Sequence, residues 1–392
     1  TVARFRAEQN EALLIMGSAT PSVESYYNVA QKSYMLVKLI KRAKGNPMPH
    51  IELIDMREEL KAGNQRIFSQ KLVDAMRQEL EAKRQVILFL NRRGHSTFVI
   101  CRECGFSLKC SHCDISLTYH YKSKSLRCHY CGYQMPAPDL CPNCGSEKIR
   151  YFGTGTEKVE QEVKYFFPEV KTLRIDADST ARKGALENML FSFREGKAQV
   201  LIGTQSIAKG LDFPRVSLVG IISADTALNM PDFRAAERTF QLITQVAGRA
   251  GRDKFLGKVI IQTYCPESFA IKYASLGRIG DFYREEINNR LRAYYPPFCH
   301  MLNITLQSTD LNLIKQESIK IKELLEQNRT SGLQILGPVP APRPFIRDNY
   351  RFHILLKAEN TNTLIEIESL LKKQRINRKI KLSWDMDPQD LL

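Results

Sequence analysis

The sequence predicts an α/β fold in which a parallel sheet is interrupted by a cysteine-rich insertion and followed by a smaller α+β domain. Three observations carry this prediction. Apolar, strand-like runs alternate with helical patterns from Ile51 onward, eight of the ten cysteines fall between Cys101 and Cys144, and the rhythm of the elements changes after about Arg292. A chain of 392 residues has the length of two or three domains.

The alternating region supplies the parallel sheet. Six short apolar runs are predicted strands: Ile51–Ile54, Val86–Leu90, Lys171–Ile175, Val200–Ile202, Val216–Ile222 and Lys258–Gln262. Helical patterns cover Ser69–Ala82, Thr156–Phe166, Ala181–Glu195 and Ala235–Val246. Apolar strands that alternate with helices predict a parallel sheet covered on both faces. Ala12–Met16 is a further predicted strand, and because it lies so near Thr1 we expect the sequence to be cut from a longer one.

The insertion contains four Cys-x-x-Cys pairs: Cys101/Cys104, Cys110/Cys113, Cys128/Cys131 and Cys141/Cys144. Thiolates at i and i+3 on a tight turn converge on one tetrahedral ion, and the glycine that follows three of the pairs permits positive φ. Eight thiolates therefore predict two four-cysteine zinc sites, which are closed and structural. The alternative is a disulfide framework, which belongs to small secreted chains, and this chain has neither their size nor their signal peptide.

Spacing within the insertion favours a nested pairing. Five residues separate the first two pairs, too few to fold face to face, whereas fourteen separate Cys113 from Cys128, enough for a hairpin. We therefore expect an inner zinc ion on Cys110, Cys113, Cys128 and Cys131, and an outer one on Cys101, Cys104, Cys141 and Cys144. An interleaved pairing stays open at this point. His112 and His129 lie inside the turns and are expected to be exposed polar residues rather than ligands.

The insertion is poor in apolar residues, so it is expected to have little core of its own. Bound zinc, worth about 10–16 kcal/mol per structural site, would then be what folds it. Tyr119, His120, Tyr121, Lys122 and Lys124 lie between the inner pairs and either stack on single-stranded bases or pack as hydrophobic cover.

The elements after Arg292 follow a different order. They are Met301–Gln307, Leu311–Gln327, the proline-rich Ile335–Pro344, Phe352–Lys357, Thr363–Gln374 and Lys381–Asp385. This β-α-β-β-α-β order predicts a small ferredoxin-like domain.

Charge points to a polyanionic partner. The formal net charge is +16, which favours nucleic acid. A basic run near the end of the chain either contacts phosphate or is a solvated surface: Lys372, Lys373, Arg375, Arg378, Lys379 and Lys381.

The longest apolar runs are too short to span a membrane, and reduced cysteines without a signal peptide favour the cytoplasm.

Two segments of the α/β region carry chemistry. Gly203–Pro214 is a loop that follows a strand, and Gln245–Arg252 ends a helix with Arg249 and Arg252 three residues apart. Small residues between the two arginines permit close backbone approach. Guanidinium groups presented in this way suit a triphosphate, where they stabilise charge on the transferred phosphoryl group.

These segments resemble the second RecA-like lobe of superfamily 2 helicases. Gly17–Ser22 is similar to motif III, Asn91–Gly94 to motif IV, Thr204–Pro214 to motif V and Gln245–Arg252 to motif VI. The cysteine insertion, together with Gly153–Glu157, Tyr295–Phe298 and Asp385–Pro388, narrows the resemblance to the PriA family of bacterial replication-restart DNA helicases. It covers essentially the whole chain and implies four parts: residues 1–45 as the end of lobe 1, 46–100 with 151–292 as lobe 2, 101–150 as the zinc insertion, and 293–392 as a C-terminal DNA-binding domain.

The resemblance also implies site residues. Arg252 would be the arginine finger, Arg249 a second contact to the γ-phosphate, and Gln245 a neighbour of both. Gly210 and Asp212 would lie near the nucleotide, and Thr204 and Gln205 would touch the DNA backbone. Thr20 would couple the nucleotide site to DNA.

The implied activity is ATP-driven 3′→5′ unwinding of DNA at stalled forks, with Mg²⁺, in the bacterial cytoplasm at the nucleoid. The implied partners are forked or single-stranded DNA, the single-strand-binding protein and other primosome proteins, with the helicase itself a monomer. The sequence contains neither a Gly-x-x-x-x-Gly-Lys-[Ser/Thr] loop nor an Asp-Glu-x-His box. We therefore expect this chain by itself to bind DNA without hydrolysing ATP. Two other readings stay open, a non-enzymatic zinc module that binds nucleic acid and an RNA helicase or topoisomerase-associated lobe.

Overall fold

The predicted α/β fold class is confirmed by a computed structural model, which describes residues 2–39, 49–90, 98–121, 123–152, 155–176, 179, 184–204, 207, 213–250 and 257–391. Its largest sheet has six strands, all parallel to their neighbours. In sheet order they are β1 (His50–Asp55), β11 (Lys258–Thr263), β10 (Val216–Ile221), β2 (Gln85–Phe89), β9 (Val200–Gly203) and β8 (Thr172–Ile175). The six strands predicted from apolar runs are thus all present, with ends shifted by one residue at most.

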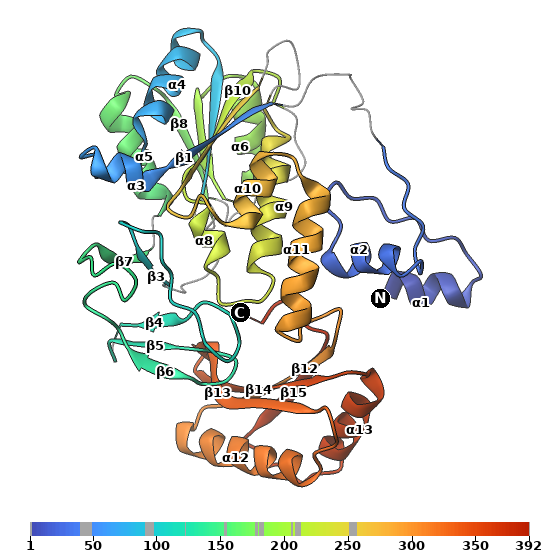
Figure 1. Cartoon of the computed structure of the whole chain (residues 1–392). Coiled ribbons are helices and arrows are strands. Elements are labelled where there is room, and N and C mark those ends of the chain that lie inside the picture. Colours follow the sequence, from blue (N-terminus) through green and yellow to red (C-terminus); the bar gives the residue numbers. More distant parts are fainter. Residues whose placement is uncertain are drawn as a thin grey trace.

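Helices cover both faces of this sheet (Figure 1). One face is covered by α4 (Gln70–Glu81) and α5 (Thr156–Phe166), which pack on Val86 and Leu88. The opposite face, with Ile87 and Phe89, is covered by α6 (Ala185–Arg194), α9 (Ala235–Ala247) and α10 (Phe269–Ser275). A further helix, α11 (Ile279–Arg292), packs on α9 and α10. Because alternate residues of a strand point to opposite faces, a fully apolar strand contributes side chains to the hydrophobic core on each face of the sheet.

Two short helices lie at the carboxyl edge of the sheet. They are α3 (Met56–Lys61), directly after β1, and α8 (Asp225–Leu228), after β10. The carboxylate of Asp55 caps α3 by accepting a hydrogen bond from the Arg57 amide at 2.9 Å, which satisfies one of the unpaired N–H groups at the helix start.

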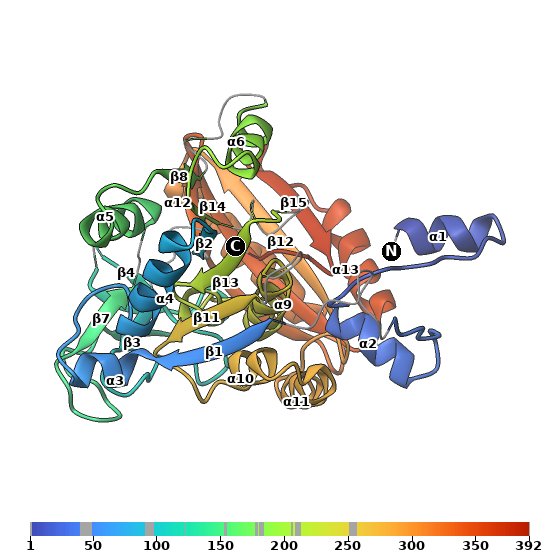
Figure 2. The same ribbon diagram turned by 90° about the horizontal axis from the view of Figure 1, so that it is seen from above.

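The beginning of the chain differs from the prediction. The chain starts with α1 (Val2–Gln9), which buries no side chain and extends away from the parallel sheet (Figure 2). The expected strand Ala12–Met16 is absent: these residues have no regular structure, and Leu13 and Ile15 are more than four-fifths exposed. The prediction was wrong because an apolar run forms a strand only where a neighbouring strand accepts its hydrogen bonds, and the described residues pair none with it.

The cysteine-rich insertion lies between the parallel sheet and the C-terminal sheet (Figure 1). It is entered by β3 (Phe98–Cys101) and left by β7 (Ile149–Phe152), which pair antiparallel. Between them a three-stranded sheet is formed by β4 (Thr118–His120), β5 (Ser125–Arg127) and β6 (Gln134–Pro136).

The sequence predicted that the insertion has little apolar core of its own. In the structure, its apolar residues share a core with those of another domain. Its buried Leu117, Leu126 and Tyr130 join one core with Met301 and Leu355 of the C-terminal domain. The insertion and the C-terminal domain are therefore stabilised by a shared hydrophobic interface as well as by any bound metal.

The C-terminal domain has the predicted β-α-β-β-α-β order. Its elements are β12 (His300–Ser308), α12 (Leu311–Gln327), β13 (Gln334–Ile346), β14 (Asn349–Ala358), α13 (Thr361–Lys372) and β15 (Lys381–Met386). The strands form an antiparallel sheet in the order β13-β14-β12-β15. Both helices pack on one face of this sheet, and the other face meets the insertion. Across the described part of the chain, no helix is both long enough and apolar enough to cross a bilayer.

Candidate functional site

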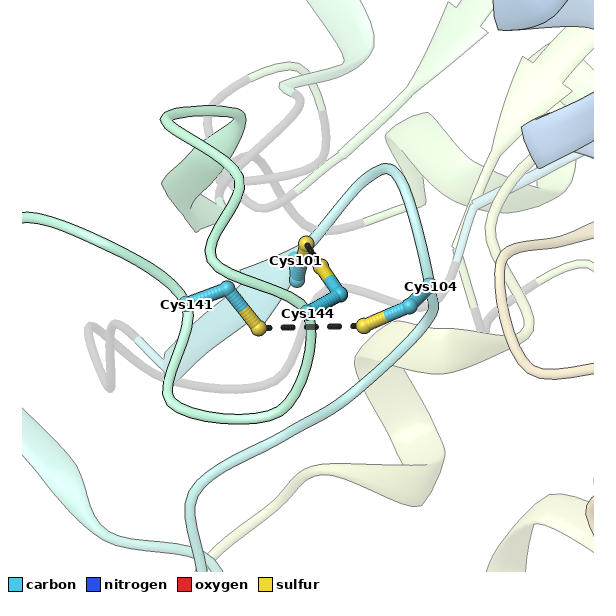
Figure 3. Close-up of side chains that lie close together, drawn as sticks. All are labelled: Cys101, Cys104, Cys141 and Cys144. Carbon is cyan, nitrogen blue, oxygen red and sulfur yellow. Dashed lines mark hydrogen bonds between the residues drawn. The ribbon is translucent and has the colours of Figure 1, made fainter.

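The eight predicted cysteine ligands lie in two groups of four. Figure 3 shows the outer group, in which the Cys101 and Cys144 sulfurs are 3.7 Å apart and the Cys104 and Cys141 sulfurs are also 3.7 Å apart. The inner group is Cys110, Cys113, Cys128 and Cys131, and within each group all sulfur atoms lie within 4.8 Å of one another. The structure thus brings the pairs together in nested rather than interleaved order.

The spacing of the sulfur atoms fits a tetrahedral zinc ion. Zinc–thiolate bonds of about 2.3 Å place the corners of a tetrahedron about 3.8 Å apart, close to the observed separations. Hydrogen bonds with the Cys110 and Cys128 thiols raise the pKa of Cys113, and burial and the charges of Cys128 and Cys131 raise it further. Four ionised thiols therefore need a cation among them, and a zinc ion would supply that charge.

Each pair is held by the same local turn. The amides of Gly105, Gly132 and Gly145 donate to the carbonyls of Cys101, Cys128 and Cys141 at 2.8–3.0 Å. All three glycines have positive φ. In the remaining pair Asp114 takes this place with φ 50°, and its amide donates to the Cys110 carbonyl at 2.9 Å. Aspartate tolerates the left-handed region better than most residues, which is why this turn forms without glycine.

The outer group is docked on the carboxyl edge of the parallel sheet. The Cys265 thiol donates to the Gly105 carbonyl at 3.1 Å, and Arg102 Nε donates to the Tyr264 hydroxyl at 2.9 Å. The inner group is docked at the other end of the insertion, where the Tyr295 hydroxyl donates to the Cys113 carbonyl at 2.7 Å. The two cysteine groups therefore bridge the parallel sheet and the C-terminal domain.

The prediction for His129 was wrong. Its ring is 1% exposed and its Nδ1 lies 3.1 Å from the Pro340 carbonyl, while His353 Nε2 lies 2.6 Å from the His129 carbonyl. The turn that carries His129 is pressed against β13 and β14, far away in the sequence, and this contact buries the ring. Burial also lowers the pKa of His353 to about 4. His112 is exposed, as expected, and neither histidine belongs to the ligand groups.

Two residues predicted from different motifs meet in the α/β region. Gln245, near the end of α9, donates from Nε2 to the Thr20 hydroxyl at 3.3 Å, and Thr20 is 5% exposed. Arg249 follows one helical turn later and is partly exposed. Thr204 directly follows β9, and its carbonyl accepts a hydrogen bond from the Ile207 amide at 3.1 Å. The structure thus joins the motif III loop to the helix that leads into motif VI.

Other predicted site residues lie outside the described residues. They are Gln205, Gly210, Asp212 and Arg252, together with the motif IV segment Asn91–Gly94 and Lys122. Of the aromatic residues between the inner cysteine pairs, Tyr119 is packed at 9% exposure and Tyr121 is 85% exposed.

Basic side chains gather on the C-terminal domain. The six residues of the predicted basic run are all exposed. The hairpin of β13 and β14 adds Arg343, Arg347 and Arg351, which sequence reasoning missed. Burial and the neighbouring Arg343 lower the pKa of Arg351, as expected for like charges held side by side. The signal available in the sequence was an arginine at every fourth position across a proline-rich turn.

Comparison with known proteins agrees with this architecture. A family model for the primosomal protein N C-terminal domain matches residues 292–389, and one for the PriA DNA helicase Cys-rich region matches residues 110–136. The replication restart protein PriA of Bacillus subtilis is 44% identical over 394 residues, which is 99% of this chain and 49% of that protein. The chain belongs to the PriA family. A model of the helicase conserved C-terminal domain matches residues 140–254.

Further relatives give the same picture. The replication restart protein PriA of Synechocystis is 41% identical over 99% of this chain and 48% of its own length, and that of Treponema pallidum is 39% identical over 100% and 59%. The chain thus spans about half the length of the curated relatives it matches. Among solved structures, S. cerevisiae Dbp5 bound to RNA and ADP BeF3 aligns with 71% of this chain and 52% of its own at 17% identity, with a TM-score of 0.33.

Proposed function

We propose that the full translation product of the gene encoding this chain is an ATP-dependent 3′→5′ DNA helicase that recognises stalled or branched replication forks and starts primosome assembly and replication restart. The observation that carries this proposal is the match of replication restart proteins over essentially the whole chain, through the parallel sheet, the cysteine insertion and the C-terminal domain. The net charge of +16 supports a nucleic-acid partner.

We assign nucleotide hydrolysis to the end of α9 and the residues that directly follow it. In this proposal Arg252 and Arg249 stabilise charge on the transferred phosphoryl group, Gln245 lies near them, and Gly210 and Asp212 lie near the nucleotide. Thr204 and Gln205 contact the DNA backbone. The contact between Gln245 and Thr20 supports the assignment, because it links two motifs that are 225 residues apart.

The two cysteine groups would each hold one structural zinc ion, with no open coordination position for catalysis. The four parts proposed are residues 1–45, 46–100 with 151–292, 101–150 and 293–392, and the separate sheets of the fold support this division. The exposed arginines and lysines of the last part would contact forked or single-stranded DNA. The single-strand-binding protein and other primosome proteins would be its protein partners, and the cytoplasm its location.

The test compares the full translation product with its Arg252→Ala variant, using Arg284→Gln as the control because Arg284 is exposed on α11. DNA-stimulated ATP hydrolysis should fall about 10³-fold or more in Arg252→Ala, with fork unwinding lost and DNA affinity kept. The control should behave as wild type.

Wild-type protein that binds DNA but neither hydrolyses ATP nor unwinds forks would contradict the proposal and favour a non-enzymatic zinc module. The 392-residue chain tested by itself should bind DNA without ATP turnover, because it contains no phosphate-binding loop sequence.

A further inference from the structure

Three polar side chains form a row along α9. Glu237, Gln241 and Gln245 are spaced by four residues, so they lie on one face of the helix. All three contact the segment from Thr20 to Val23. Glu237 accepts a hydrogen bond from the Val23 amide at 3.1 Å, Gln241 Nε2 lies 3.4 Å from the Thr20 carbonyl, and Gln245 donates to the Thr20 hydroxyl at 3.3 Å.

A buried arginine on α11 secures this row. Arg290 is 2% exposed, and its guanidinium pairs with Glu237 and, at 2.8 Å, with Glu286. It also reaches Glu24 at 3.0 Å, on the helix α2 (Val23–Ala30) that begins at the end of the Thr20–Val23 segment. One guanidinium therefore connects α11, α9 and α2.

Burial of the charged groups in this cluster is unfavourable in free energy. Three carboxylates lie around the Arg290 guanidinium, and Glu24 also lies 4.0 Å from the guanidinium of Arg234. Burial raises the pKa of Glu286 to about 7 although Arg290 opposes that shift. The same elements already have an apolar core, in which the rings of Phe240 and Phe282 stack at a centroid distance of 4.0 Å. A buried ionic network adds little net stability to such a core, but it permits only one relative placement of the groups that it joins.

The placement that the network permits is the one in which Thr20 lies against Gln245. The Tyr283 hydroxyl donates to the Pro21 carbonyl at 2.6 Å, and its ring stacks on Tyr26 of α2 at 4.1 Å. Together with the row on α9, these contacts set how far along the helix the Thr20 hydroxyl lies. A shift by one helical turn would move Thr20 away from Gln245 and leave Glu237 without the Val23 amide.

We propose that Arg290, Glu237 and Gln241 are positioning residues that hold the Thr20–Glu24 segment in register along α9, and so keep Thr20 against Gln245. None of them reaches the nucleotide in this scheme, and they act through Thr20 and Gln245. The inference rests on the proposed function for its catalytic meaning, whereas the register itself is a property of this chain.

The register is tested first in the 392-residue chain by hydrogen exchange. Glu24→Gln removes the charge that reaches Arg290, and Gln241→Met removes the amide at similar volume. Either variant should speed exchange of the amides of residues 20–26 roughly tenfold or more, since hydrogen bonds to charged groups are lost, while exchange in α9 stays slow. Arg284→Gln on the exposed side of α11 is the matched control and should change neither region.

Unchanged exchange at residues 20–26 would overturn the proposal, and so would equal acceleration throughout α9, because that would mean general loss of structure. Glu24→Asp keeps the charge and should restore part of the protection.

The catalytic consequence is tested in the full translation product. Glu24→Gln should lower kcat for DNA-stimulated ATP hydrolysis about tenfold and leave KM for ATP within about twofold, as expected for a group that aligns catalytic residues without binding substrate. A raised KM at unchanged kcat would contradict a positioning role. Wild-type protein without ATPase activity would contradict the proposed function instead, and the exchange measurement would still decide whether the register exists.

Discussion

Replacing Gly105 by alanine tests whether the outer cysteine group is docked on the parallel sheet. Gly105 has a φ of 77°, and a Cβ built on it would lie 2.1 Å from the Tyr264 carbonyl oxygen and 3.1 Å from the carbonyl carbon. That carbonyl belongs to a fixed backbone, because the Tyr264 amide donates to the buried carboxylate of Asp225 at 3.1 Å. Either the turn or the sheet edge must move.

The cost can be estimated from three contributions. Alanine in the left-handed region costs about 1 kcal/mol. Relieving the overlap costs about 1–3 kcal/mol, as for other overpacked sites. Separation of the two surfaces also removes the hydrogen bond from Cys265 to the Gly105 carbonyl, worth about 1 kcal/mol. Gly105→Ala should therefore lower the free energy of unfolding by about 3–5 kcal/mol.

Gly145 provides a matched control. It follows the second cysteine of another pair in the same outer group, has a φ of 72°, and a Cβ there would meet nothing within 4 Å. Gly145→Ala should therefore cost only the conformational contribution, about 1 kcal/mol. Denaturant unfolding of the zinc-loaded chain measures both values. Equal destabilisation by the two variants would refute the docking, because the variants share the backbone strain and differ only in the contact with Tyr264.

Three further predictions concern the metals, the interface and the DNA. Elemental analysis should find two zinc ions per chain, and a result of fewer than two ions would contradict the proposed metal sites. Removal of the metal with a chelator should expose the apolar interface of the insertion to a hydrophobic dye while the parallel sheet stays folded. Because the pKa of His353 falls from 6.5 to about 4 on folding, the unfolded chain binds the proton first as pH falls, so wild-type stability should be full above about pH 6.5 and drop by up to about 3 kcal/mol toward pH 4. That pH-dependent loss should shrink in His353→Gln, and a variant with the same loss as wild type would exclude His353 as its source. If Arg343 and Arg351 contact phosphates, replacing both by glutamine should reduce the slope of log affinity against log salt by about 0.9 for each contact, measured by fluorescence anisotropy, and an unaltered slope would place the DNA elsewhere.

Local patterns predicted most elements of this fold. The helix expected at Thr156–Phe166 has those bounds in the structure, and the six strands of the parallel sheet end within one residue of their predicted positions. The cysteine turns were predictable for the same reason, since a Cys-x-x-Cys turn is made by consecutive residues. The fourteen residues between Cys113 and Cys128 also sufficed to indicate the hairpin that brings the inner group together.

The errors concern residues whose surroundings come from distant parts of the chain. Ala12–Met16 is as apolar as a strand but has no strand beside it among the described residues, so its backbone stays irregular. His129 lies in a polar turn that reads as exposed, yet a carbonyl 211 residues away covers its ring. No local pattern of the cysteine insertion indicates which surface it will meet.

The features that the sequence determines differ from those that only the tertiary structure determines in the range of the interactions involved. Turn geometry, strand and helix periodicity and the spacing of thiols act over a few residues. The order of elements, the grouping of the cysteines and the family resemblance could therefore be predicted directly from the sequence. The clustering of Glu24, Glu237 and Glu286 around Arg290 joins residues up to 266 positions apart. Such a cluster forms only when packing of the apolar core brings its members together and removes the water that would otherwise separate their charges. The register of Thr20 on α9 and the docking of the two cysteine groups were therefore decided by the tertiary structure.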